Sequence, residues 1–282
     1  MKTQRNLSIG GVGLMAGALA CAGLLSAGAA VGGTVTASGS QWNHATPATN
    51  GPSGSGATVV TTGNISPTLA LSYGAYASHA GSDSASAGYS SSNGGSAELT
   101  VSDSAYWTSS YVGLSPGSGS FGDLRNTTMS FTVLSNTSNN SSAHPYAILS
   151  LTDGTDYYDV INMEAGSGAY SISSSSSVSI YNSSTQAWVT GNGSGTSYAL
   201  STIYNTVVDP NASNLTYGDL AVTLATANIG SFGSKGNNET AYIGSMSVVT
   251  TTPIPGSGFL AAVGGLALIG GLALRRRMAK LQ

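Results

Sequence analysis

The sequence has a single cysteine, Cys21, which lies in an apolar stretch near the N-terminus. Removal of that stretch leaves a chain without a thiol, and therefore without a disulfide, a Cys-ligated metal or a Cys nucleophile. Lipid attachment at Cys21 is disfavoured, because Leu19 stands one position away from where a lipoprotein signal needs it.

Charged residues are also scarce. The 282 residues include eight Lys or Arg, eleven Asp or Glu and three His, for a net charge of −3. Six of the eight basic residues lie in the two ends, and all eleven acidic residues lie between them. The central part therefore has two basic and eleven acidic side chains, a formal charge of −9. Nucleic-acid binding needs basic patches that displace counterions from phosphates, so this composition excludes nucleic acid as a partner.

The N-terminus has the three parts of a secretory signal. Lys2 and Arg5 form a short positive region, and an apolar, small-residue stretch follows over 9–25. We predict a signal peptide over 1–30 that signal peptidase removes; an uncleaved membrane anchor is the alternative. The small residues that mark the cleavage site are Ala27, Ala29 and Ala30.

The C-terminus pairs an apolar segment with a basic cluster. Residues 259–274 would span about 24 Å as a helix, against about 30 Å for a bilayer core, so we predict a short transmembrane helix. The cluster that follows, Arg275, Arg276 and Arg277, should stay on the cytoplasmic side. The part before Pro253 would then face outward.

The segment 253–282 resembles the PEP-CTERM sorting signal, which exosortase enzymes read in bacteria with envelopes rich in exopolysaccharide. The matching features are Pro253 and Pro255, the apolar run 259–274 and the Arg cluster 275–277. Ile254 departs from the pattern, because the family usually has Glu there. The resemblance covers about the last 30 residues and implies an exosortase-type transpeptidase as a partner. A plain tail anchor without processing is the alternative.

The central part has the pattern of an all-β domain. About a third of its residues are Ser or Thr, which are poor helix formers. Residues 31–56 are rich in Gly, Ser and Thr, and we interpret them as a flexible or only partly ordered leader. Over 57–252, short runs such as 129–133 alternate apolar and polar residues, as strands do. Asp153-Gly154 between two apolar runs predicts a hairpin. We predict an antiparallel, jelly-roll-like β-sandwich over 57–252.

Patterns typical of catalysis are weak. His44, His79 and His144 lack the spacing of metal ligands. The Gly-x-Ser-x-Gly match at 113–117 has Pro116 after its serine, and proline cannot supply the oxyanion-binding N–H, so we interpret the match as a turn. The three glutamates have no acidic residue two positions on, which leaves only a carboxylate pair from distant strands. We predict that the protein is not an enzyme.

Two groups of residues are candidates for binding. Asp153, Asp156 and Asp159 crowd around the predicted hairpin and offer hard oxygen ligands for Ca²⁺; the alternative is turn chemistry at Asp153 and solvated edge positions for the other two. We predict no other cofactor. The aromatic residues could instead form a sugar-stacking face, although they are also simply good strand formers. The stacking candidates are Tyr157, Tyr158, Trp188, Tyr170 and Tyr181.

These observations favour an exported protein of the cell surface or extracellular matrix. It would be anchored transiently by its C-terminal helix and would contribute to envelope or exopolysaccharide structure. The alternative is a carbohydrate-binding module on the same scaffold, with polysaccharide as its partner. A glycoside hydrolase or lyase is the less favoured third possibility.

Overall fold

The computed structural model describes ten segments of the chain. They are residues 33–50, 58–77, 83–102, 108–117, 119–140, 144–162, 168–190, 197–208, 215–230 and 238–251. The signal peptide, the Pro-x-Pro motif, the apolar run and the Arg cluster that the sequence predicts lie outside these segments. Within the described segments, no helix is both long enough and apolar enough to cross a membrane.

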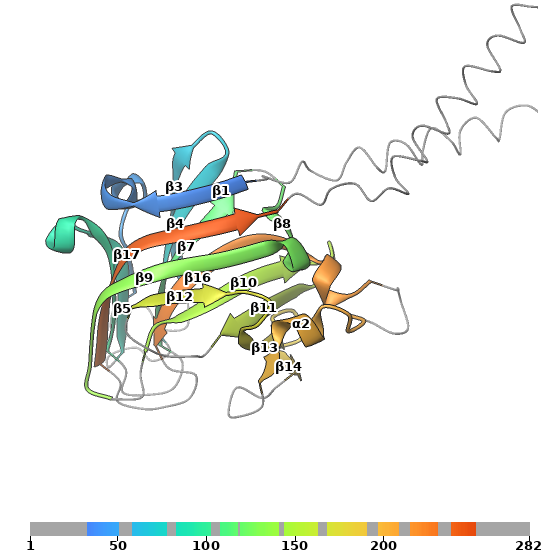
Figure 1. Cartoon of the computed structure of the whole chain (residues 1–282). Coiled ribbons are helices and arrows are strands. Elements are labelled where there is room, and N and C mark those ends of the chain that lie inside the picture. The colour runs from blue at the N-terminus through green and yellow to red at the C-terminus, as the bar shows by residue number, and fades with distance from the viewer. Residues whose placement is uncertain are drawn as a thin grey trace, which may run out of the picture.

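The described strands form two sheets (Figure 1). Within each sheet, all the paired strands are antiparallel. We call them the smaller and the larger sheet. In spatial order the smaller sheet contains β12 (Ala169–Ile172), β9 (Thr127–Ser138), β17 (Asn238–Thr250), β6 (Ser96–Ser102), β5 (Ser84–Ser90) and β2 (Ala48–Asn50), with β1 (Gly33–Ser38) also paired to β17.

The larger sheet has eight strands on its main path. In spatial order they are β14 (Ala187–Thr190), β13 (Ser177–Asn182), β11 (Tyr157–Asn162), β10 (Tyr146–Thr152), β16 (Ala221–Gly230), β7 (Ser109–Pro116), β4 (Leu69–Tyr76) and β3 (Thr58–Ser66). Two short strands pair beside this path, β15 (Tyr198–Ala199) with β13 and β8 (Gly122–Asp123) with β16. The chain moves repeatedly from one sheet to the other, which is the connectivity of a jelly roll.

Short helices occupy connections and contribute little to the framework. They are η1 (Gly39–His44), η2 (Ser92–Gly94), η3 (Leu124–Asn126), α2 (Leu200–Ile203) and η4 (Tyr217–Asp219). This scarcity of helix agrees with the hydroxyl-rich composition.

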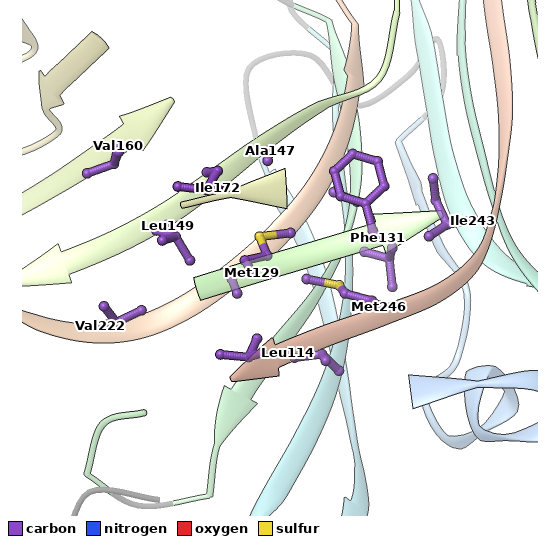
Figure 2. Close-up of a cluster of buried hydrophobic side chains, with 14 of the residues drawn as sticks. Leu114, Met129, Phe131, Ala147, Leu149, Val160, Ile172, Val222, Ile243 and Met246 are labelled. Atoms are coloured by element: carbon purple, nitrogen blue, oxygen red, sulfur yellow. The ribbon is translucent and has the colours of Figure 1, made fainter. Parts of the chain in front are cut away.

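The core lies between the two sheets, because each sheet turns one set of alternating side chains inward (Figure 2). In β9, Met129, Phe131 and Val133 are buried and the intervening positions are not. Leu149 of β10 and Val160 of β11 are fully buried from the larger sheet. The predicted antiparallel β-sandwich is therefore confirmed.

The predicted hairpin is also present. β10 and β11 pair from Ala147 with Asn162 to Thr152 with Tyr157. The Asp153 carboxylate caps the turn, since its Oδ1 accepts hydrogen bonds from the backbone N–H groups of Thr155 and Asp156. Asp153 therefore has the turn role that Asp prefers at this position.

The leader predicted over 31–56 differs from the structure, which builds residues 33–50 into the sandwich as β1, η1 and β2. The Trp42 side chain is fully buried, and its Nε1 donates a hydrogen bond to the Gly244 carbonyl at 3.3 Å. The Tyr73 hydroxyl donates to the Trp42 carbonyl at 2.6 Å. The prediction was wrong here because composition alone indicates a linker, whereas one large buried side chain and strand pairing with β17 and β5 hold the segment in place.

Arg125 is the one Lys or Arg in the described part of the chain, and it serves the fold. Its guanidinium donates hydrogen bonds to the Tyr204 carbonyl at 3.3 Å and to Asn205 Oδ1 at 3.2 Å, and lies 5.6 Å from the centre of the Tyr204 ring. A Cβ at Gly218 would lie 2.7 Å from this guanidinium and 2.7 Å from the Tyr204 carbonyl oxygen, and since the carbonyl belongs to the backbone, glycine is needed there. Arg125 therefore ties η3 to the segments around α2 and η4.

Candidate functional site

A cavity of about 560 Å³ lies across the outer face of the larger sheet. Its size is within the usual range for small-molecule sites. Each strand on the main path of that sheet, from β14 to β3, contributes at least one lining residue. Its aromatic lining consists of Tyr76, Tyr111, Tyr146, Tyr181 and Trp188, and its polar lining of Thr58, Ser109, Asp159, Gln186 and Asn228.

The strand alternation explains why these side chains face outward. In β7, Val112 and Leu114 are fully buried in the core, so Ser109 and Tyr111 point to the opposite face. In β11, Val160 is inward and Asp159 is outward by the same rule. The outer face of the larger sheet is thus lined by aromatic, hydroxyl and amide groups.

The strand register arranges these residues in two rows. The first row runs over β10, β11, β13 and β14 through the cross-strand pairs Ser150–Asp159, Asp159–Tyr181 and Tyr181–Trp188. Residues directly opposite one another in antiparallel strands have Cβ atoms about 5 Å apart and point to the same side. We call Asp159, Tyr181 and Trp188 the first row.

The second row crosses the middle of the sheet. Tyr146 of β10 pairs with Asn228 of β16, which pairs with Tyr111 of β7. Tyr111 in turn pairs with Gly74 of β4. We call Tyr146, Asn228 and Tyr111 the second row.

Gly74 makes room for the Tyr111 ring. A Cβ built on Gly74 would lie 2.0 Å from Cε1 of Tyr111 and 2.1 Å from its Cζ. No side chain larger than hydrogen fits beneath the ring, so the ring lies directly against the backbone of β4. The ring therefore forms a supported aromatic wall of the cavity.

Tyr181 and Trp188 form an aromatic corner. Their ring centroids are 5.1 Å apart and their planes meet at 64°, an edge-to-face arrangement. Gln186 lies in the turn between their strands and has a positive φ of 57°. The Asn182 side chain stabilises this turn by accepting a hydrogen bond from the Thr185 backbone N–H at 2.8 Å. The corner therefore has a well-defined shape.

Asp159 is the one charged side chain among the described residues that line the cavity. Its Oδ1 accepts a hydrogen bond from the Ser150 hydroxyl at 2.7 Å, and its Oδ2 accepts one from the Ser183 hydroxyl at 2.5 Å. Hydrogen bonds from two hydroxyl groups fix the direction of the carboxylate. Each carboxylate oxygen can accept a further bond from a ligand.

Two of the tyrosines that line the cavity, Tyr111 and Tyr146, have a raised pKa. Burial raises the pKa of Tyr111 above its ordinary value of 10.0. Burial also raises the pKa of Tyr146, and the negative charges of Glu239 and Asp159 add to the effect. Both phenols therefore keep their O–H protons at physiological pH.

The structure separates the aromatic residues that the sequence put forward for sugar stacking. Trp188 and Tyr181 line the cavity, whereas Tyr157 is 58% exposed on the surface and is not part of the lining. Tyr158 was wrongly predicted, because it points into the core and packs edge-on against Tyr217 with centroids 5.5 Å apart. Tyr170 belongs to the smaller sheet and stacks on Phe131 at 4.7 Å.

The predicted calcium ligands do not form a shared ligand set. No group of three or more His, Cys, Asp or Glu side chains in the described segments is placed to hold a metal ion. Asp153 caps its own turn, and Asp159 faces the cavity between two serines. Asp153 and Asp156 lie in the turn between β10 and β11, outside the strand that positions Asp159.

The Gly-x-Ser-x-Gly match at 113–117 lies mostly within strand β7, with Gly117 directly after it. The interpretation as a turn is therefore corrected, because Gly113 pairs with Ser72 and Ser115 with Ala70 in the larger sheet. A serine inside a regular strand lacks the sharp bend on which a nucleophile elbow depends.

A smaller hollow of about 250 Å³ lies over β2, β5 and β6 on the smaller sheet. Tyr89 and Glu98 line it, and the Tyr242 hydroxyl donates a hydrogen bond to Glu98 at 3.2 Å. It has fewer aromatic side chains and less than half the volume of the cavity on the larger sheet, so the larger cavity is the stronger candidate.

The sequence did not indicate Tyr76, Tyr111, Tyr146 or Asn228 as members of one site. Their outward parity is visible within each strand, but their grouping depends on the pairing of β10 with β16 and of β7 with β4. These strands are far apart in the sequence, and no local signal specifies such pairings.

Comparison with known proteins gives distant structural neighbours. A loop-swap mutant of the xylanase Xyn11A from Neocallimastix patriciarum is 9% identical, with 73% of this chain and all of that chain covered and a TM-score of 0.39. The family 11 xylanase from the same organism gives the same identity and coverage with a TM-score of 0.35. No family model and no curated protein sequence matches the chain.

Proposed function

We propose that the protein is a non-catalytic, glycan-binding protein of the cell surface, with the cavity on the larger sheet as its binding site. The observation that carries this proposal is the lining of that cavity by five aromatic side chains interspersed with hydroxyl and amide groups. Sugars combine apolar C–H faces with hydroxyl edges, so they are bound by aromatic rings together with hydrogen-bonding groups.

The extent of the cavity favours a polymer over a single sugar. Its lining reaches from β14 to β3, the two ends of the main path of the larger sheet. Neighbouring strands lie about 4.8 Å apart, so eight strands laid flat would cover roughly 34 Å. An elongated site of this kind accommodates several consecutive sugar units.

The charge of the cavity favours binding without hydrolysis. Glycosidases of the common mechanisms place two carboxyl groups about 5 to 9.5 Å apart. Among the described lining residues only Asp159 carries a carboxylate. The site can therefore hold a glycan while lacking, among the described residues that line it, a second carboxylate for acid–base or nucleophilic cleavage.

A glycan-array experiment with the full chain, purified in detergent, tests this proposal. We expect saturable binding to one group of oligosaccharides and no release of new reducing ends on prolonged incubation. An array without saturable binding would contradict the glycan-binding role and leave the purely structural role as the better hypothesis. Release of reducing ends, abolished by Asp159→Asn, would instead show that the protein is an enzyme.

The export route is a separate part of the proposal and rests on the terminal sequence signals. Signal peptidase would remove residues 1–30, and an exosortase-type enzyme would process the segment 253–282. Mass spectrometry of the mature protein from its native host should then recover a C-terminal peptide that ends before Phe259. Recovery of an intact peptide containing Arg275 would contradict processing and indicate a retained membrane anchor.

A further inference from the structure

The proposed glycan site has a composition that discriminates between classes of glycan. Of the described lining residues, Asp159 is charged and the rest are neutral, so the cavity has a net negative charge. The one described Lys or Arg, Arg125, bonds to Tyr204 and Asn205 and does not line the cavity. A ligand with carboxylate or sulfate groups would therefore be repelled, whereas a cationic ligand would be attracted.

The first row brings together the two features that bind an ammonium group. Asp159 lies directly opposite Tyr181, and Tyr181 lies directly opposite Trp188, so a carboxylate stands beside an aromatic corner. A cation is attracted to the negative face of an aromatic ring, and this effect is strongest for Trp. A carboxylate next to aromatic faces provides a charge partner as well as these ring contacts.

The Asp159 carboxylate is held in a fixed orientation before a ligand binds. Hydroxyl groups from Ser150 of β10 and Ser183 beyond β13 hold its two oxygens from opposite sides. A bond from a neutral serine orients the carboxylate but leaves its charge uncompensated. The charge is also felt elsewhere in the cavity: burial raises the pKa of Tyr146 in the second row most, and the charges of Glu239 and then Asp159 add to the effect.

We propose that the ligand is a glycan with protonated amino groups, such as a wholly or partly deacetylated polymer of amino sugars. Asp159 binds the ammonium group, and Tyr181 and Trp188 contact the sugar ring that carries it. The uncharged second row, with Tyr111 and Asn228, binds the neighbouring sugar units through ring faces and hydrogen bonds. This inference rests on the proposed glycan-binding function and specifies its ligand class.

The test compares three β-1,4-linked hexasaccharides that share one backbone geometry: glucosamine, N-acetylglucosamine and glucose. Calorimetry with the full chain at pH 5, where most of the amines are protonated, should show binding of the glucosamine hexamer about tenfold tighter than that of the two neutral hexamers. Its affinity should fall as the salt concentration rises, while the affinity for the neutral hexamers should change little.

Asp159→Asn removes the charge but keeps the shape of the side chain. We expect this variant to lose about tenfold in affinity for the glucosamine hexamer and to bind the N-acetylglucosamine hexamer unchanged. Asp156→Asn is the matched control, because it makes the same change in net charge on the adjoining turn outside the cavity lining, and it should bind as the parent does. The salt dependence of the parent provides a second measurement should Asp159→Asn fail to fold.

The outcomes distinguish the amino-sugar ligand class from glycan binding itself. Equal affinity for all three hexamers, or an equal loss for all three in Asp159→Asn, would overturn the amino-sugar assignment and leave glycan binding intact. A loss in Asp156→Asn as large as that in Asp159→Asn would show that only the overall charge matters, and would also overturn the assignment. Absence of binding to these hexamers and to every glycan of the array would overturn the proposed function itself.

Discussion

Trp42→Ala should lower the free energy of unfolding by about 3–5 kcal/mol, the range for truncating a large buried aromatic residue. The Trp42 side chain is fully buried, and its Nε1 donates to the carbonyl of Gly244 in β17. The main-chain carbonyl of Trp42 accepts the Tyr73 hydroxyl, so both sheets are linked through this residue. Truncation leaves a cavity and removes the hydrogen bond that joins η1 to β17.

Chemical denaturation of the parent and of the variant measures this effect. Val60→Ala is a suitable control, since Val60 is 51% exposed on β3 and its truncation should change the free energy of unfolding by less than about 0.5 kcal/mol. Trp42→Phe should be intermediate, because it restores much of the packing without the N–H donor. A loss below about 1 kcal/mol in Trp42→Ala would show that residues 33–50 are not an integral part of the sandwich.

The alternation of apolar and polar residues predicted strands in the centre of the chain, but not that residues 33–50 form part of the sandwich. Alternation of apolar and polar residues at 129–133 marks one buried face of β9, and Asp153-Gly154 marks the turn between β10 and β11. Residues 33–50 have only one short alternation, in which the small apolar residues Val35 and Ala37 stand between hydroxyl residues. Their order depends on pairing with β17, which is about 200 residues later in the chain, and on a single tryptophan.

The candidate site was predictable only in part, for a related reason. Alternation requires Tyr157 and Tyr158 to point to opposite faces, but it does not say which face is the core, because a shift of one residue in register reverses both. The sequence put both forward as stacking residues, and the structure buries Tyr158. The neighbours of Asp159 and Tyr111 in the cavity come from strand pairings over long distances, which no spacing in the sequence encodes.

Trp188→Ala should weaken binding of the preferred oligosaccharide by about 10- to 100-fold, since an aromatic residue that makes a main contact with a ligand contributes on the order of 2 kcal/mol. Trp188 lies on β14 at the end of the main path, is only half-buried, and forms the aromatic corner with Tyr181. The variant should therefore fold normally while losing the ring face that contacts the sugar. Calorimetry with the oligosaccharide that the array identifies measures the loss.

Tyr157→Ala tests whether glycan binding needs the aromatic residues that line the cavity or any aromatic residue near it. Tyr157 lies nearby on β11 and does not line the cavity. Its affinity should stay within about twofold of the parent, whereas Trp188→Phe should retain part of the binding through its smaller ring. Equal losses in Tyr157→Ala and Trp188→Ala would mean that the glycan extends past the cavity over the surface of β11. No loss in either variant would place the glycan elsewhere, with the hollow beside Glu98 and Tyr89 on the smaller sheet as the next site to test.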